Sequence, residues 1–205
     1  MLKLDCLEIG FPDRAWSKQI SLTVRAGEIC VLHGPSGCGK STLLSTIAGF
    51  QPALSGILSW QDKNLLDLAP WDRPLTLLFQ SGNLFEGLTL YQNVALGIRT
   101  SGQLSKSERQ TIKALLERFE LQDLSERLPQ ALSGGQQQRA GLARAILRQQ
   151  PILLLDEPFT GLDEDRRKTA IQLISNISKE QNCAILLVSH DMRDAEALGA
   201  HSFSL

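Results

Sequence analysis

Long hydrophobic runs are missing from this sequence of 205 residues. The longest are residues 152–155 and 184–188, which are far shorter than the roughly 20 apolar residues that a membrane-spanning helix requires. The first residues do not show the charged and then apolar order of a secretory leader. We therefore expect a soluble chain located in the cytoplasm.

The sequence also lacks an excess of either charge. Its 21 lysine and arginine residues and 22 aspartate and glutamate residues leave a net charge of -1, which gives no reason to expect nucleic acid or an anionic membrane surface as the main partner. The four cysteines have no paired spacing, which fits a reducing compartment and indicates no cysteine metal site. The length and the 42% hydrophobic content suit one α/β domain with room for a smaller subdomain.

A glycine-rich stretch carries the strongest functional signal in the chain. It reads Gly34, Pro35, Ser36, Gly37, Cys38, Gly39, Lys40, Ser41 and Thr42. Its glycines permit positive φ angles and let backbone N–H groups approach anionic oxygens. Lys40 adds a positive charge for the outer phosphates of a polyphosphate, and Ser41 adds a hydroxyl for Mg²⁺.

The context of this stretch is the one that a phosphate loop needs. The apolar residues 29–32 predict a buried strand before it, and residues 42–48 predict a helix after it. The N-terminus of that helix would then face the phosphates. The alternative is a glycine-rich turn without a ligand, which the full motif in its strand, loop and helix context disfavours.

The first 28 residues predict two strands with one solvated face. Leu2, Leu4 and Cys6 alternate with Lys3 and Asp5, and residues 20–24 repeat the alternation before a turn. Two aromatic residues, Phe11 and Trp16, lie between these strands. Either ring could stack on a nucleotide base, although packing is the more common role of a lone aromatic near a strand end.

Polar residues follow three further predicted strands. The strand at 75–79 leads to Gln80, the strand at 152–155 leads to Asp156 and Glu157, and the strand at 184–188 is followed by Ser189 and His190. Ligands of open α/β sheets gather at the carboxyl ends of strands. Asp156 suits a Mg²⁺ shell and Glu157 could polarise an attacking water.

Gln80 and His190 each have two competing interpretations. Gln80 could contact a metal ion or water, but an ordinary solvated loop residue is the favoured interpretation from its own context. His190 could bind a terminal phosphate, and by itself would more often cap a helix or pack against one.

A helical block occupies roughly residues 84–147. Ser105 and Glu108 predict a capped helix start, and the apolar residues from Ile112 to Phe119 share one helix face. We interpret the block as a helical subdomain inserted into the α/β core. Toward its end comes the pentapeptide Leu132-Ser133-Gly134-Gly135-Gln136, in which Ser133 is a natural N-cap and the glycines expose N–H groups to an anion. A capped helix with a flexible entry is the alternative.

Taken in order, these segments resemble the ATP-binding cassette ATPase family from residue 2 to residue 205. The pentapeptide separates this family from other phosphate-loop NTPases. The resemblance implies one nucleotide-binding domain over residues 1–205, with an α/β core of the P-loop NTPase type, an antiparallel β subdomain and the inserted helical subdomain. It implies ATPase activity, with ATP and Mg²⁺ as cofactors.

The resemblance also implies roles for single residues. Lys40 and the loop backbone would hold the phosphates, while Ser41, Gln80 and Asp156 would serve Mg²⁺. Glu157 would be the general base and His190 would contact the γ-phosphate. By its register from the strand at Ile20, Phe11 matches the family's base-stacking aromatic.

The resemblance further implies partners. Family members work as head-to-tail dimers, so that the stretch from Ser133 through Gly134 and Gly135 to Gln136 would close on ATP held by the other copy, with Asp163 near the interface. The helical block and glutamine loop resemble the part that grips a membrane permease. Residues 78–93 look most like bacterial importer ATPases of the thiamine-importer type. This resemblance implies a peripheral location on the inner face of the membrane and an indirect link to a solute-binding protein. We expect no nucleic acid partner.

Two other functions stay open at this point. A soluble ATPase of this family could act on DNA or ribosomes, although such proteins usually carry long coiled coils or two cassettes. A regulatory module without turnover is the other, and the presence of both Glu157 and His190 argues against it. Family chains usually continue with more strands, whereas residues 201–205 end this sequence, so we expect an incomplete last strand and no regulatory domain.

Overall fold

A computed structural model of the chain describes residues 1–13, 16–100 and 103–205. These residues form two compact units, which we describe separately. The core unit comprises Met1–Leu77, Gln150–Asp156 and Ser175–Leu205, and the helical unit comprises Leu78–Gln149 and Glu157–Ile174. Residues 101–102, which belong to the range expected as a helical subdomain, lie outside the described residues.

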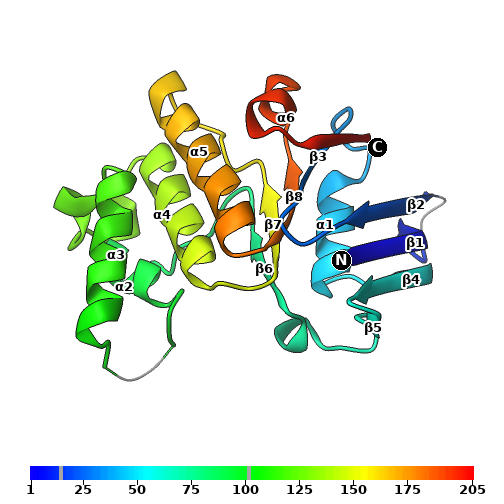
Figure 1. Cartoon of the computed structure of the whole chain (residues 1–205), viewed down its shortest axis with the longest axis horizontal. Coiled ribbons are helices and arrows are strands. Elements are labelled where there is room, and N and C mark those ends of the chain that lie inside the picture. Colours follow the sequence, from blue (N-terminus) through cyan, green and yellow to red (C-terminus); the bar gives the residue numbers. More distant parts are fainter. Residues whose placement is uncertain (14–15, 101–102) are drawn as a thin grey trace. The chain divides into compact units, whose positions relative to one another are not determined.

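An antiparallel sheet forms one part of the core unit (Figure 1). Its strands are β1 (Leu2–Gly10), β2 (Ser17–Val24), β4 (Ser55–Trp60) and β5 (Lys63–Asn64), in the order β2-β1-β4-β5. The alternation of apolar and polar residues explains its single buried face, because successive side chains of a strand point to opposite sides. Leu2 and Leu4 are buried, whereas Lys3 and Asp5 are only partly so.

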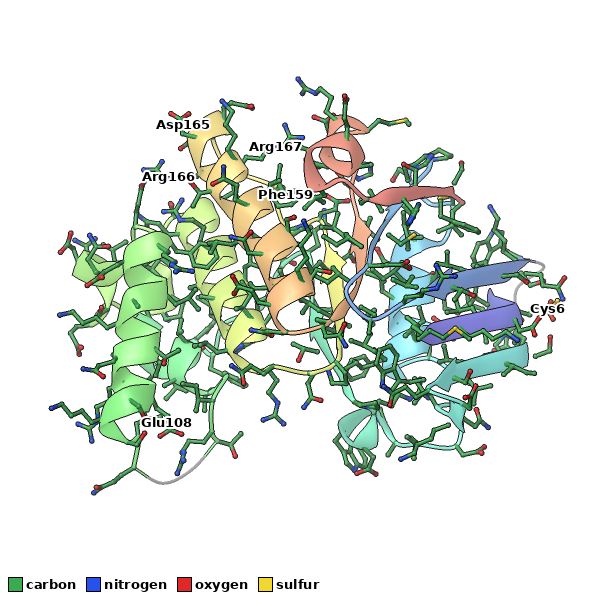
Figure 2. The ribbon with its side chains drawn as sticks, viewed as in Figure 1. Cys6, Glu108, Phe159, Asp165, Arg166 and Arg167 are labelled. Atoms are coloured by element: carbon green, nitrogen blue, oxygen red, sulfur yellow. The ribbon has the colours of Figure 1, made fainter. Side chains whose placement is uncertain are left out.

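The predicted orientation of Cys6 is wrong. The register of β1 shifts between Leu4 and Leu7, so Cys6 is exposed, with φ 47°, and Leu7 takes the buried position. The bulge exists because one extra residue enters the strand. It also explains Gly56, where a Cβ atom would lie 2.3 Å from the Cys6 carbonyl oxygen. Figure 2 shows Cys6 at one end of the strands of this sheet.

A parallel sheet forms the other part of the core unit. It contains β3 (Ile29–His33), β6 (Leu75–Leu78), β7 (Ile152–Asp156), β8 (Ala184–Val188) and β9 (His201–Ser204), in the order β6-β7-β8-β3-β9. β7 and β8 are buried along their whole length, as continuous apolar strands of a covered parallel sheet should be. Because β7, β8 and β3 are neighbours and parallel, their carboxyl ends meet at one edge of the sheet.

Two helices pack against these strands within the core unit. Helix α1 (Lys40–Ala48) contacts β1 and β7, and the short α6 (Arg193–Leu198) contacts β3. Leu43, Leu44 and Ile47 of α1 are fully buried in a core that also contains residues of both sheets. The packing of α1 between the two sheets fixes the helix that follows the phosphate loop.

The helical unit contains α2 (Leu90–Ala95), α3 (Lys106–Arg118), α4 (Gly134–Leu147) and the first part of α5 (Glu164–Glu180). The described residues between 84 and 147 contain no strand. The apolar face predicted for α3 is buried, from Ile112 to Phe119. Each of α2, α3 and α4 begins with a capping box, and the one at Ser105 and Glu108 confirms the predicted start of α3.

The remaining elements are short. In the part of the chain that the structure describes, 3₁₀ turns lie at Pro70–Asp72, Gln122–Leu124 and Pro129–Ala131. None of the helices within the described ranges combines the length and apolar character needed to cross a bilayer.

A buried arginine holds the C-terminal end of α1. Arg73 is 7% exposed, and its Nη1 atom donates to the carbonyl oxygens of Thr46 at 2.9 Å and Ile47 at 2.7 Å. Its Nε atom donates to Leu68 at 3.2 Å. A cation at this end of a helix is favourable because the last carbonyls carry partial negative charge. Burial lowers the pKa of the Arg73 guanidinium, so the carbonyl groups are what stabilise the charge there.

We predict that Arg73→Met lowers the thermal unfolding midpoint by roughly 5 °C, because two carbonyl groups at the end of α1 lose a charged donor. Arg25→Met is the matched control. The Arg25 side chain is 74% exposed in its ion pair with Glu28, so its removal should shift the midpoint by less than about 2 °C. Equal midpoints for the two variants in a calorimetric scan would contradict the role given to Arg73.

Candidate functional site

The phosphate loop connects β3 to α1 in the core unit. Gly34, Gly37 and Gly39 have φ angles of 151°, 79° and 104°, which side chains other than glycine rarely adopt. A Cβ atom on Gly34 would also lie 2.6 Å from the carbonyl oxygen of Leu205. The backbone of this loop therefore depends on its glycines, as the sequence predicted.

Lys40 is buried within the loop that precedes it. It is 6% exposed, and its Nζ atom donates to the carbonyl oxygens of Gly34 at 2.8 Å and Pro35 at 3.0 Å. The Cys38 sulfur lies 3.8 Å from the same nitrogen. These three partners are uncharged or weak acceptors, so the site holds a positive charge that an anion would stabilise.

The N-terminus of α1 differs from those of α2, α3 and α4. Its N-cap is Gly39, which has no side chain to accept a hydrogen bond, and its first turn contains no acidic residue. The other three helices each have a hydroxyl N-cap in a capping box. Since the first N–H groups of a helix need acceptors, a phosphate oxygen fits the start of α1.

The edge of the parallel sheet adds oxygen ligands to the core unit. Asp156 ends β7 and is 7% exposed, and Ser41 lies exposed in the first turn of α1. A hydroxyl and a carboxylate are hard oxygen donors of the kind that Mg²⁺ binds. The chemistry of these two residues therefore fits the metal.

His190 lies in the turn after β8 and is exposed. The neighbouring Ser189 is buried, donates through its hydroxyl to Asp194 and accepts the N–H of Asp191 at 3.0 Å. These contacts fix the turn on both sides of His190. Sequence reasoning missed Asp194, since a carboxylate six residues after the strand carried no signal of its own.

The two aromatic candidates have different surroundings. Phe11 is 37% exposed. Trp16 is partly buried against the phosphate loop, where a Cβ atom on Gly39 would lie 2.6 Å from the Trp16 ring. Trp16 therefore supports the loop directly, a contact that the sequence did not indicate.

Glu157 belongs to the helical unit and follows Asp156 directly in the chain. Its φ is 49°, a left-handed conformation that costs energy for a residue with a side chain. Its Oε2 atom accepts hydrogen bonds from Gln80 Nε2 at 3.0 Å and Thr160 Oγ1 at 3.2 Å. The structure thus places Gln80 in contact with the predicted base. The sequence around Gln80, considered alone, had favoured an ordinary solvated loop residue.

The predicted cap of α4 is present. The Ser133 hydroxyl accepts the N–H of Gln136 at 3.3 Å, and Gln136 Oε1 accepts the N–H of Ser133 at 2.8 Å. Gly134 is exposed at the helix start. Gly135 allows a close approach to the loop before α5, because a Cβ atom at Gly135 would lie 2.6 Å from the Gly161 carbonyl oxygen.

Asp163 caps α5. Its Oδ1 atom accepts the N–H of Arg166 at 3.0 Å, and its Oδ2 atom accepts from the Arg166 guanidinium. These contacts, the backbone one first, lower the pKa of Asp163. Arg166 also pairs with Glu120 at 3.1 Å, and Figure 2 shows it at the start of α5 beside Asp165 and Arg167. The helix cap was not predicted.

The predicted residues therefore fall into two sets. The core unit contains Phe11, the phosphate loop, Asp156 and His190, and the helical unit contains Gln80, Glu157, Asp163 and the start of α4. The first set can hold a polyphosphate and a metal ion. The second set presents a carboxylate with defined hydrogen-bond partners and a glycine-containing helix start.

Comparison with known proteins places these features in a family. The ABC transporter family model matches residues 17–160. A thiamine import ATP-binding protein, ThiQ, of Photorhabdus laumondii is 44% identical over 95% of this chain and 82% of its own length. The ThiQ protein of Haemophilus influenzae is 45% identical, over 92% of this chain and 86% of its own.

A solved structure shares the fold. The ATP-binding cassette MJ0796, described as a dimer in a post-hydrolysis state bound to ADP and Pi, matches with a TM-score of 0.85 and 29% identity. The match covers 96% of this chain and 91% of that one. With its phosphate loop, its two sheets and its motifs in this order, the chain belongs to the ABC transporter family and has the ATP-binding cassette fold.

Proposed function

We propose that this chain is the ATP-hydrolysing subunit of a membrane importer and powers transport through a partner permease. The start of α1 carries the proposal, because an uncapped helix N-terminus beside a buried lysine suits a nucleotide phosphate chain. The importer assignment rests on relatives that are named thiamine import ATP-binding proteins. Action on DNA or ribosomes is not favoured by these relatives.

In this proposal each predicted nucleotide or metal ligand has a stated role. The loop from Gly34 to Thr42 and the Lys40 ammonium bind the phosphates, and Phe11 stacks on the base. Ser41, Asp156 and Gln80 hold Mg²⁺. When bound, the metal neutralises charge on the β- and γ-phosphates.

Hydrolysis then needs a base and a group that senses the γ-phosphate. The Glu157 carboxylate accepts a proton from the attacking water, and the phosphoryl group passes to that water as ADP leaves. His190 donates a hydrogen bond to the γ-phosphate. The Gln80 and Thr160 contacts to Oε2 orient the carboxylate before the reaction.

Two copies of the chain would share each ATP. Dimeric structures of the related cassette support this arrangement. Residues Ser133 to Gln136 of one copy close on ATP held by the phosphate loop of the other, and Asp163 lies near the interface. The two copies close only when the γ-phosphate is present, and they separate after hydrolysis. Binding of ATP and its turnover therefore drive a cycle between a closed and an open dimer.

The location and the cargo follow from the partner. As one nucleotide-binding domain with an inserted helical subdomain at roughly 84–147, the chain would sit on the inner face of the membrane, bound to its permease and linked only indirectly to a solute-binding protein. Thiamine is the first cargo to test, because the relatives carry that name.

We predict that Glu157→Gln lowers kcat for ATP at least about 100-fold, because the amide cannot take the proton from water. The KM for ATP should change less than about threefold, and dimers should accumulate with ATP. Glu164→Gln is the control, since that side chain is 65% exposed at the start of α5. Steady-state kinetics and sedimentation measure both effects, and wild-type turnover in Glu157→Gln would remove Glu157 as the base.

We predict that Ser133→Arg blocks ATP-dependent dimerisation without abolishing nucleotide binding, because a bulky cation would stand where the other copy closes. Ser105→Arg is the matched control, since Ser105 is also the N-cap of a capping box. Both variants lose a cap worth about 1 kcal/mol, but only the first should stay monomeric in light scattering. Normal dimers of Ser133→Arg would contradict the shared site.

We predict that the chain co-purifies with a polytopic membrane protein from its native cells, and that this complex hydrolyses ATP faster when a solute-binding protein loaded with thiamine is added. A complex that forms but responds to another solute would keep the transport function and exclude thiamine. Stimulation by DNA or ribosomes in place of a membrane protein would contradict the transport function.

A further inference from the structure

Gln138 joins α4 to the backbone of the proposed base, and we call α4 the signature helix because the pentapeptide at residues 132–136 lies at its start. Its Nε2 atom donates to the Glu157 carbonyl oxygen at 3.2 Å. Gln138 is 7% exposed and lies two residues after Gln136, the last residue of the pentapeptide. The contact lies wholly within the helical unit.

The contact acts on a residue whose backbone needs support. Glu157 has a φ of 49°, and a left-handed conformation persists in a non-glycine residue only when its surroundings hold it. The Gln138 amide holds the carbonyl, while Gln80 and Thr160 hold the carboxylate. The Glu157 carbonyl oxygen also accepts the N–H of Thr160 at 3.3 Å, so loss of the amide would leave this carbonyl with the turn contact and without a donor from α4.

A second contact links the same two segments. Gly135 approaches the Gly161 carbonyl oxygen so closely that a Cβ atom would lie 2.6 Å from it. Thr160, which donates to the Glu157 carboxylate, directly precedes Gly161. The start of α4 therefore touches the segment 157–161 at both of its ends, and a displacement of α4 must displace Glu157.

We propose that Gln138 is a positioning residue that fixes Glu157 and makes it follow the signature helix of the same chain. The proposal rests on the function proposed above, in which this helix closes on ATP held by the partner copy. When α4 of one chain closes on the ATP held by its partner, Gln138 fixes the orientation of Glu157 in the same chain. Glu157 then acts on the ATP that this chain itself holds. One buried amide thus couples the two nucleotide sites of the dimer.

The variant that tests this is Gln138→Met, which keeps the length and apolar stem of the side chain but removes the donor. We expect kcat for ATP to fall about tenfold, with KM changed less than about twofold, because orientation of the base matters in the transition state and not in binding. ATP-dependent dimers should form as in the wild type. Gln138→Leu, which also lacks a donor and has an apolar side chain, takes the same test if Gln138→Met fails to fold.

Gln137→Met is the matched control. Gln137 is the neighbouring glutamine of α4, and its amide also donates to backbone carbonyls, those of Pro129 at 2.9 Å and Leu132 at 3.3 Å. It has no described contact with Glu157. We expect its kcat to stay within about twofold of the wild type, because its hydrogen bonds are similar in kind and differ in target.

Mixed dimers separate positioning from a general defect of the interface. A dimer of one Glu157→Gln chain and one Gln138→Met chain has its only intact base beside the altered residue, so it should be about tenfold slower than a dimer of Glu157→Gln with wild type. Placing both substitutions in one chain beside a wild-type chain should give no further loss, because that chain has no base to position. Two differently tagged chains allow each dimer to be purified.

The outcomes distinguish the two proposals. Full activity of Gln138→Met, or equal losses in both mixed dimers, would overturn the role of Gln138 while leaving the ATPase function intact. An inactive wild-type chain would overturn the proposed function itself, and a fully active Glu157→Gln variant would remove Glu157 as the base and with it the reason to position that residue. A loss confined to the dimer in which Gln138→Met accompanies the intact base supports the inference.

Discussion

The stabilisation of one buried positive charge governs the rest of the structure. Lys40 is nearly inaccessible and bonds to two carbonyl oxygens of its own loop, at the start of a helix whose N-cap has no side chain. A charge in this setting is costly without an anion. The glycine angles of the loop, the packing of α1 between two sheets, and Arg73 at the far end of α1 all hold this arrangement in place.

The helices of this chain begin with different caps. At α2 and α3 a hydroxyl and a glutamine or glutamate close a capping box, as at Thr89 and Ser105, whereas α5 is capped by the Asp163 carboxylate and the short α6 has no side-chain cap. α1 has no such box, and α4 has one but places two glycines directly behind its serine. Ser133 therefore stabilises its own helix first, and any contact with a nucleotide of the partner adds to a helix that is already formed.

Local chemistry predicted most of the fold. The apolar run before Asp156 became β7, and the serine–glutamate spacing at 105–108 became a capping box. The bulge at Cys6 was missed because alternation alone cannot reveal an inserted residue, whose partner Gly56 lies 50 residues away. Likewise, Gln80, Gln138 and Glu157 meet through contacts between distant segments, and no spacing in the sequence encodes such contacts.

The grip of the α1 start and Lys40 on phosphate is tested most directly by titrating the chain with ATP, ADP, AMP and adenosine in the presence of Mg²⁺ in a calorimeter. If the phosphates supply most of the binding energy, affinity should fall at each removal of a phosphate, with AMP at least about 100-fold weaker than ATP. Equal affinities for ATP and adenosine would show that the loop does not hold the phosphate chain and would contradict the assignment of the site.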